Sequence, residues 1–277
     1  MSDDRTCNIC GCTEFVKEVY VRKFLYVNCV SCDTARVYPY PSEKELFDIY
    51  NNDYINIEEP NVSTKEHFKE ENFKFYSRIM DMNFRDLNIK PSQFLNILDI
   101  GCAIGLFLDY FSMKNSKADI IGIDISNEMI EIAKSKGHIA KKINFIDFNE
   151  NNNYDLITMW DVIEHLIDPV SYLNKSYKLL KLNGSIIIHT PCRGILSKNY
   201  GEYWPHYIPP QHVHLFSQKG LFALVENCGF TIAGWTRFGS GIDKGKVPDV
   251  YKSTFDKVCK ELGISDTIVI HCKKNKQ

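Results

Sequence analysis

Four cysteines near the N-terminus have the spacing of metal ligands. They form two pairs, Cys7 with Cys10 and Cys29 with Cys32, and the pattern reads C-x2-C-x18-C-x2-C. Each short knuckle presents two thiolates on one face, and four thiolates complete a tetrahedron around Zn²⁺. The spacing predicts a structural zinc site, because four thiolates leave no position open for water or substrate. Cys12 breaks the two-residue spacing and is expected to be a spare thiol.

A second set of residues suits the binding of a nucleoside cofactor. Asp99 precedes a turn that contains Gly101 and Gly105, where the backbone can approach a ligand at the start of a helix. Asp124 ends the next apolar run, where a carboxylate can accept hydrogen bonds from both ribose hydroxyls. The alternative for this residue is a helix N-cap, a role for which the serine two positions later competes. Asp147 ends a third run, where a carboxylate can accept from an adenine amino group.

The glycine turn differs from two common phosphate-binding motifs. A dinucleotide fingerprint needs G-x-G-x-x-G, and here Ala103 and Leu106 occupy its second and third glycine positions. The sequence also has no G-x-x-x-x-G-K-[ST] run, which argues against a nucleoside triphosphate site. By itself the turn is therefore weak support for any particular ligand.

Short apolar runs alternate with helical patterns and would position these residues. Strands are expected at residues 94–100, 119–124, 142–147, 154–160, 185–189, 230–235 and 266–272, with helices from 106, over 127–136 and over 220–228. Such alternation predicts an α/β fold with a doubly wound, mostly parallel sheet, which binds ligands at the carboxyl ends of its strands. A strand and hairpin at 15–27 separates the cysteine pairs.

Changes in composition divide the chain into three parts. A zinc-ribbon module is expected at residues 1–41, ending at a proline-rich connector. Residues 42–90 carry apolar residues at helical spacing and are expected to form helices that cover the cofactor. The main domain follows at 91–277, with an aromatic insertion at about 192–217 as the substrate-binding segment, since long loops in compact domains are usually functional.

Composition and charge narrow the classes of protein that the chain can belong to. It has 277 residues, 44% hydrophobic, so a sizeable core needs no disulfide scaffold despite the 10 cysteines. No apolar run is long enough to span a membrane and no secretory signal precedes the first knuckle, so a cytoplasmic location is expected. The formal charge of -2, with no basic stripe, disfavours a nucleic-acid partner.

The order and spacing of these motifs resemble class I S-adenosylmethionine-dependent methyltransferases. The resemblance covers roughly residues 94–272 and includes LDIGCAIG at 98–105, GIDIS at 122–126 and DLITMWDVIEH at 155–165. It implies a Rossmann-like, seven-stranded sheet and S-adenosylmethionine as cofactor, with S-adenosylhomocysteine as product. The cofactor-binding residues that it implies are Asp99, Gly101, Gly105, Asp124, Ile125, Asp147 and Trp160. Ala103 departs from the glycine usual there and implies a slightly tighter loop.

Histidine is the natural proton acceptor near neutral pH, and eight are present. His165 and His189 follow predicted strands and could reach a pocket rim, although a structural role is as plausible for each. The segment QHVHLFS at 211–217 resembles the E-H-x-Y-x-F-S segment of nucleotide-linked deoxysugar methyltransferases, which also carry an N-terminal four-cysteine zinc module. The histidine matching His212 is the proposed base in that group. Gln211 departs from the glutamate found there.

The resemblance predicts O-methylation of a sugar or nucleotide-linked saccharide, in cell-surface polysaccharide biosynthesis, with His212 as catalytic base. Tyr203, Trp204, Tyr207 and His214 are the predicted acceptor-binding residues, unless the aromatic side chains only pack the insertion. One alternative function is an RNA methyltransferase whose zinc ribbon recognises the substrate. Another is a non-catalytic module that binds the cofactor. The sequence leaves the oligomeric state open.

Overall fold

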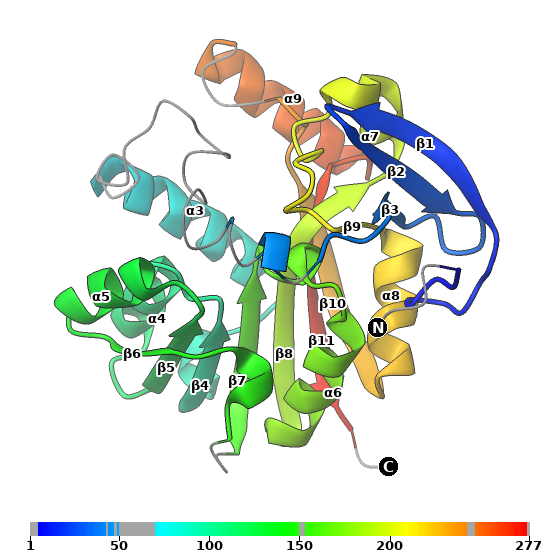
Figure 1. Cartoon of the computed structure of the whole chain (residues 1–277). Helices are drawn as coiled ribbons and strands as arrows, with labels where there is room; N and C mark the ends of the chain where they lie inside the picture. Colours follow the sequence, from blue (N-terminus) through cyan, green and yellow to red (C-terminus); the bar gives the residue numbers. More distant parts are fainter. Residues whose placement is uncertain are drawn as a thin grey trace.

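A computed structural model describes residues 5–42, 44–46, 49, 70–149, 153–242 and 247–275. Its centre is a sheet in which seven strands lie in the order β6-β5-β4-β7-β8-β11-β10 (Figure 1). The strands are β4 (Asn96–Ile100), β5 (Asp119–Asp124), β6 (Ile139–Lys142), β7 (Tyr154–Trp160), β8 (Leu180–Arg193), β10 (Phe230–Phe238) and β11 (Thr267–Lys274). The first five are mutually parallel, and β11 is antiparallel to both neighbours. The predicted mostly parallel α/β sheet is confirmed.

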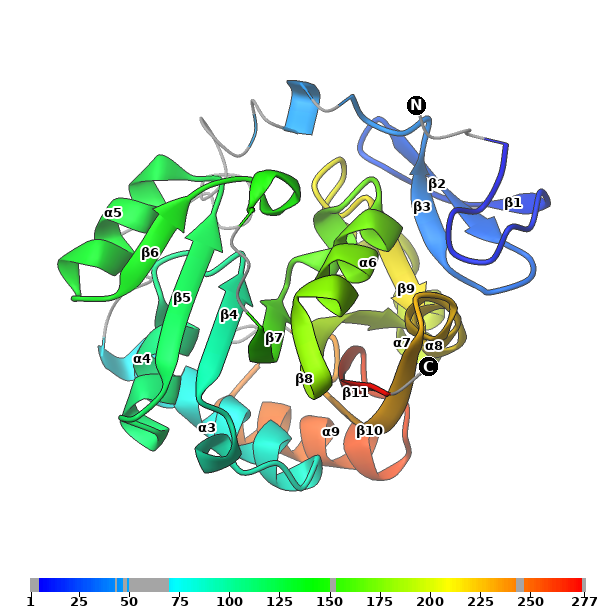
Figure 2. The ribbon, with the colours of Figure 1, turned by 90° about the horizontal axis from the view of Figure 1, so that it is seen from below.

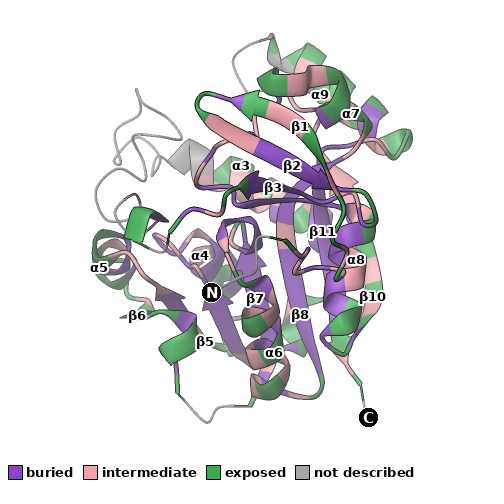
Figure 3. Ribbon diagram, turned by 45° about the vertical axis from the view of Figure 1, so that its right-hand side comes forward, coloured by how far each residue is buried: buried purple, intermediate pink, exposed green. Residues whose placement is uncertain are grey.

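Alternating side chains of the central strands build a separate core on each face of this sheet. On one face, Ile97, Leu156 and Ile187 pack with α3 (Glu70–Asp86), α4 (Leu106–Lys114) and α5 (Asn127–Ser135). On the other face, Leu98 and Ile157 pack with α6 (Pro169–Leu179) and α8 (Gln218–Asn227). Both faces are apolar because helices cover both, and the strands at the centre are buried (Figure 3). Figure 2 shows the helices on either side of the strands.

The N-terminal residues form an antiparallel sheet that joins the central one. It consists of β1 (Phe15–Val21), β2 (Phe24–Cys29) and β3 (Ala35–Tyr38). Strand β9 (His214–Ser217) pairs with β3 on one side and with the last two residues of β8 on the other. Backbone hydrogen bonds therefore connect the cysteine-bearing module to the methyltransferase-like sheet through the predicted insertion.

Several elements differ from the sequence expectation. The third parallel strand ends at Lys142, and Asp147 lies in a 3-10 turn (Phe145–Asp147), so the prediction that it ends a strand was wrong. The Asn144 side chain accepts from the Ile146 amide at 3.0 Å and thereby caps this turn. Strand β8 is longer than expected. The helices α7 (Ile195–Tyr200) and α9 (Asp249–Glu261) and strand β9 were not predicted.

A buried arginine holds the N-terminal module against the end of β8. The Arg193 side chain is fully buried, and its guanidinium donates to Asn28 Oδ1 at 2.8 Å, to Asp33 Oδ1 at 2.7 Å and to Glu18 Oε1 at 2.6 Å. Burial alone would raise the pKa of Asp33, but Arg193 and neighbouring donors hold that pKa below its ordinary value. The guanidinium thus spans two elements of the module from a single position on the sheet.

We expect Arg193→Ala to lower the free energy of unfolding by about 3 kcal/mol, because it leaves two carboxylates without their buried cation. Lys198→Ala is the matched control, since Lys198 Nζ pairs with the same Asp33 at 3.1 Å from an exposed position. This control should cost less than about 1 kcal/mol. Urea unfolding of both variants makes the comparison, and equal destabilisation would contradict the assigned role of Arg193.

Candidate functional site

The turn after β4 has the backbone conformation of a ligand-binding loop. Gly101, Ala103 and Gly105 all have positive φ, at 71°, 43° and 81°. A Cβ atom on Gly101 would lie 2.4 Å from Val162 Cγ2, so glycine is required there. A residue with a Cβ is disfavoured in this backbone region, which explains why glycine is usual at the position that Ala103 occupies. The turn leads into α4, whose first amides face this edge of the sheet.

Asp124 is held at the end of β5 by backbone donors. Its Oδ2 accepts from the Ala103 amide at 2.9 Å, and its Oδ1 accepts from the Ser126 amide at 2.8 Å. Ser126 supplies the N-cap of α5 by accepting from the Met129 amide, so Asp124 is not needed for that role. Ile125, between them, is partly exposed, and Asp147 is exposed on the 3-10 turn that follows β6. The carboxylate of Asp124 is thus presented beside the glycine turn.

Asp99, by contrast, is almost completely buried, with 2% of its surface exposed. Burial, helped by the nearby Asp124 carboxylate, raises its pKa to about 8, although a hydrogen bond from Thr158 Oγ1 at 2.7 Å acts in the opposite direction. A buried carboxyl with this pKa attracts a cationic group, because a cation removes the penalty of ionising it. The cationic group that the sequence resemblance predicts beside Asp99 is the charged methionine part of S-adenosylmethionine.

A pocket of about 300 Å³ opens at the end of β7, beside His189 of β8. Tyr76 and Met80 of α3 line one wall, Trp160 and His189 line the strand ends, and Phe238 of β10 closes another side. Burial raises the pKa of the Tyr76 hydroxyl, and the nearby carboxylates of Asp99 and Asp161 raise it as well. This tyrosine therefore lines the pocket and lies near both carboxylates.

Trp160 connects the glycine turn and the pocket through ring contacts. Its indole packs 5.6 Å from the Phe107 ring of α4 and 5.6 Å from the His189 ring. Its Nε1 is buried and has no hydrogen-bond acceptor among the described residues. An indole N–H usually has an acceptor when it is buried, so a bound molecule is the natural partner here.

Two histidines line the pocket, and each faces a carboxylate. His206 Nε2 lies 3.2 Å from Asp266 Oδ2, and His189 Nδ1 lies 2.9 Å from Asp161 Oδ1. Burial alone would raise the pKa of Asp266, but His206 and the Trp204 indole donate to it and hold that pKa below its ordinary value. Neither pair could be predicted from the sequence, because each aspartate is far from its histidine along the chain.

The predicted base His212 lies behind His206 and is 4% exposed. Its Nδ1 lies 2.8 Å from the His206 carbonyl oxygen, and its ring stacks on the His206 ring at 6.4 Å. Burial lowers its pKa well below the ordinary value, so the ring is neutral near pH 7. The ring of His165 packs edge-on against it at 4.8 Å, and burial lowers the pKa of His165 to about 4.

The other predicted acceptor-binding residues do not share one surface. Tyr203 is 82% exposed, whereas Trp204 and Tyr207 are buried in a core with Tyr26 and other residues of the N-terminal sheet. Both nitrogens of His214 have partners, since Nδ1 donates to the Leu166 carbonyl and Nε2 lies 3.1 Å from the Tyr40 hydroxyl. Burial lowers the pKa of His214 to about 3. Trp204 and Tyr207 therefore fit the alternative role, in which the aromatic side chains pack the insertion.

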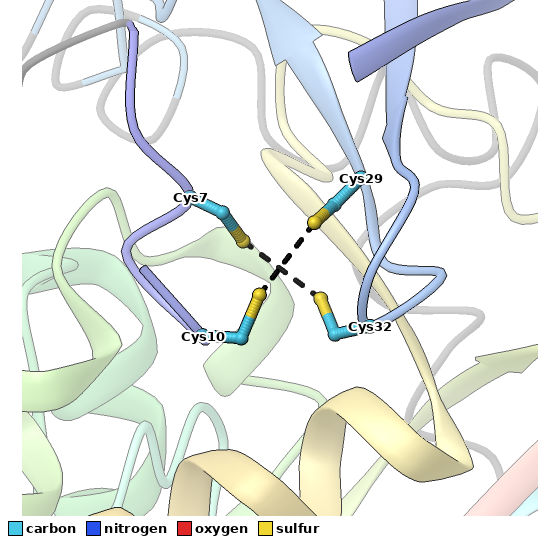
Figure 4. Close-up of side chains that lie close together, drawn as sticks. All are labelled: Cys7, Cys10, Cys29 and Cys32. Atoms are coloured by element: carbon cyan, nitrogen blue, oxygen red, sulfur yellow. Dashed lines mark hydrogen bonds between the residues drawn. The ribbon is translucent and has the colours of Figure 1, made fainter. Parts of the chain in front are cut away.

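The four N-terminal cysteines converge on one point, as Figure 4 shows. Cys7 Sγ lies 3.8 Å from Cys32 Sγ, and Cys10 Sγ lies 3.6 Å from Cys29 Sγ. Four sulfurs at about 2.3 Å from a tetrahedral zinc ion are about 3.8 Å apart, so the spacing suits that ion. The thiols are free rather than paired in disulfides. This group suggests a metal site, and its sulfur ligands favour zinc.

Comparisons with known proteins agree with this arrangement. The profile of a family described as "Methyltransferase domain" matches residues 64–233. The chain belongs to this methyltransferase family. Its members transfer a methyl group from S-adenosylmethionine. The sequence resemblance predicts that the acids and glycine turn at the ends of β4 and β5 bind that cofactor in this methyltransferase.

Individual relatives of the methyltransferase have different named acceptors. A ubiquinone biosynthesis O-methyltransferase of Bartonella tribocorum is 26% identical over 176 residues, which cover 55% of this chain and 70% of that protein. Phosphoethanolamine N-methyltransferase 3 of Arabidopsis thaliana is 33% identical over 52% of this chain, but only 30% of that protein is covered. The solved structure of the plantazolicin methyltransferase BpumL with S-adenosylhomocysteine has 18% identity and a TM-score of 0.56, covering 83% of this chain and 94% of that one, which supports the fold alone.

We expect Asp124→Ala to weaken the binding of S-adenosylhomocysteine to the methyltransferase by about 10- to 100-fold, since hydrogen bonds to a charged acceptor contribute about 1.5–3 kcal/mol. Asp119→Ala is the matched control, because Asp119 begins the same strand and is exposed at the opposite end. Calorimetric titration of both variants measures the affinity. Thermal unfolding verifies that each is folded, and equal affinities would contradict the assignment of Asp124 to the cofactor.

Proposed function

We propose that this methyltransferase methylates a hydroxyl group of a small molecule, with His206 as the base. The observation that carries the proposal is the His206–Asp266 pair, which lines the pocket next to the cofactor acids. A hydroxyl must lose its proton as it attacks a methyl group, and a positioned histidine near neutral pH suits that transfer. An amine acceptor that is already deprotonated would need no such base.

The chemistry follows from the orientation of the His206 ring. Its Nε2 faces the Asp266 carboxylate, which leaves Nδ1 as the nitrogen that can accept a proton. S-adenosylmethionine supplies the methyl group, so the acceptor oxygen forms the new C–O bond while the C–S bond electrons remain on sulfur. The hydroxyl proton passes to His206 Nδ1, and Asp266 stabilises the resulting imidazolium. Asp266 also fixes the ring through its second contact with the Trp204 indole.

The sequence prediction that His212 is the base stays a prediction. The geometry supports His206 better, because the His206 side chain is 28% exposed and lines the pocket, whereas His212 is 4% exposed. His212 supports His206 instead, through its contact with the His206 carbonyl and through ring stacking.

A sugar or nucleotide-linked saccharide is the acceptor class that we propose first. Phe75 and Phe238 offer apolar ring surfaces in the pocket, and Asp161 and Asp256 offer carboxylate oxygens that can accept from hydroxyl groups. This support is independent of Trp204 and Tyr207, which are buried in the core. The relatives are named for ubiquinone biosynthesis and for phosphoethanolamine, so acceptors of these two kinds are the main competitors.

We expect His206→Ala to lower kcat by about 10²- to 10⁴-fold while leaving the affinity for S-adenosylhomocysteine unchanged, because the base acts only in the chemical step. Asp266→Asn should reduce kcat to a smaller extent, since it leaves the ring in place without its counter-charge. His271→Ala is the control, because His271 lies 2.9 Å from Ser185 Oγ and is not among the described residues that line the pocket.

Methyl transfer from labelled S-adenosylmethionine is measured with nucleotide sugars, catechol-type phenols, primary amines and RNA. Turnover of a nucleotide sugar or another hydroxyl acceptor supports the proposal, and turnover confined to amines or RNA overturns it. Wild-type kcat in His206→Ala would remove His206 from the mechanism. Cofactor binding without transfer to any of these acceptors would favour the non-catalytic alternative.

We also propose that Cys7, Cys10, Cys29 and Cys32 hold one structural zinc ion. The sulfur spacing supports this, and so do the knuckle turns, in which the Gly11 amide donates to the Cys7 carbonyl and the Asp33 amide to the Cys29 carbonyl. The ion would leave no open coordination position. The ion would tie the end of β2 and the turn before β3 to the first knuckle. It would thereby stabilise the module whose strand β3 pairs with β9.

We expect purified protein to contain one zinc ion per chain by elemental analysis, and Cys29→Ser to lose it together with several degrees of thermal stability. Cys12→Ser is the matched control, because Cys12 directly follows the first knuckle and its sulfur is bonded only to the Glu14 backbone among the described contacts. Full zinc content in Cys29→Ser would contradict the four-cysteine assignment.

A further inference from the structure

A second group of metal-ligand side chains lies beside the pocket, separate from the cysteines. Glu164, His165 and His212 each offer one ligand atom, and these atoms all lie within 4.8 Å of one another. Glu164 and His165 belong to the 3-10 turn after β7, and His212 belongs to the segment before β9. An ion at about 2.1 Å from each ligand holds them up to about 4.2 Å apart, so small side-chain movements would close this group around it.

Both imidazoles are oriented by backbone carbonyls, as metal-bound histidines usually are. His165 Nδ1 lies 3.1 Å from the Gln211 carbonyl oxygen, and His212 Nδ1 lies 2.8 Å from the His206 carbonyl oxygen. A carbonyl only accepts, so each neutral ring carries its proton on Nδ1. The lone pair is then on Nε2, in the form that coordinates a metal, and the carbonyl bonds fix each ring in direction.

The third ligand is also fixed and lies in a negative environment. Glu164 is fully buried, and its Oε2 accepts from Thr190 Oγ1 at 2.9 Å. Asp161 is close enough to act electrostatically on both His165 and His212. Two carboxylates beside two neutral imidazoles make a favourable place for a divalent cation, because burying a carboxylate without a cation is expensive.

A buried polar side chain next to the group independently indicates a missing partner. Gln211, whose carbonyl orients His165, is 0% exposed, and neither its amide oxygen nor its amide nitrogen has a hydrogen-bond partner among the described residues. A buried, unsatisfied amide costs about 1–3 kcal/mol. An ion with its bound water would offer this side chain a partner.

We propose that Glu164, His165 and His212 bind a divalent first-row transition-metal ion at the back of the acceptor pocket. Two imidazole nitrogens and one carboxylate suit Zn²⁺, Fe²⁺ or Co²⁺ rather than Mg²⁺ or Ca²⁺, which prefer oxygen ligands. The ion would tie the segment that carries His206 and His212 to the end of β7, and thereby hold His206 in register with Asp266. Binding at this site goes beyond the proposed methyl transfer and does not depend on it.

The test uses the full chain, first shown by elemental analysis to retain the zinc of its four cysteines. Co²⁺ is then titrated and followed by calorimetry and by visible absorption. We expect one further ion per chain, with the weak bands of nitrogen and oxygen ligands and without intense thiolate-to-metal charge transfer. His212→Ala and Glu164→Gln should each weaken Co²⁺ binding by at least about 100-fold, whereas the control His271→Ala should bind Co²⁺ like the wild type.

Cys29→Ser separates the two sites, because it should lose zinc at the cysteines and keep the Co²⁺ site. Thermal unfolding with and without Co²⁺ keeps the test valid if one variant is unstable, since the ion should raise the midpoint of the wild type but not of His212→Ala. No Co²⁺ binding beyond the cysteine site, or unchanged binding in His212→Ala and Glu164→Gln, overturns the proposal. Failure of methyl transfer alone would leave this site unaffected.

Discussion

The arrangement of this protein depends on strand β8 continuing beyond the edge of the parallel sheet. Its last two residues, Cys192 and Arg193, pair with β9, and β9 in turn pairs with β3 of the N-terminal module. A continuous ladder of backbone hydrogen bonds therefore links three parts of the chain that are remote in sequence. Because each backbone group in the ladder is satisfied by the next strand, none of the three parts can shift alone without exposing unpaired donors and acceptors.

This ladder explains how an N-terminal cysteine module can matter to chemistry at a distant pocket. The Tyr26 hydroxyl of β2 donates to the His212 carbonyl at 2.8 Å, and Tyr26 packs against Tyr207 with ring centroids 4.9 Å apart. The segment that carries His206 and His212 is thus supported from the module side. Arg193 adds a charged connection to the same contact. The module therefore packs behind the segment that carries His206 and His212.

The edge where the parallel strands end gathers carboxylates, and different partners stabilise each one. Thr158 holds Asp99, backbone amides hold Asp124, and His206 holds Asp266. Asp99 and Asp124 lie near the carboxyl ends of the parallel strands β4 and β5, and Asp266 directly precedes the antiparallel strand β11, which starts opposite the last part of β8. The resulting negative edge favours a cationic cofactor, and burial together with the neighbouring Asp124 raises the pKa of Asp99. His189 and His206 line the neighbouring pocket, and each faces a carboxylate.

Local pattern determined much of this protein from sequence alone: the alternating strands and helices, the cysteine knuckles and the positions of Asp99 and Asp124. These follow from side-chain periodicity and short-range spacing, which act within a few residues. Only the tertiary structure decided that Trp204 and Tyr207 are core residues, that Asp266 faces His206, and that Glu164 and His165 meet His212. An aromatic ring suits a core and a pocket equally well, and a histidine nitrogen takes its role from the carbonyl or carboxylate that packing brings to it, so neither outcome is encoded in neighbouring residues.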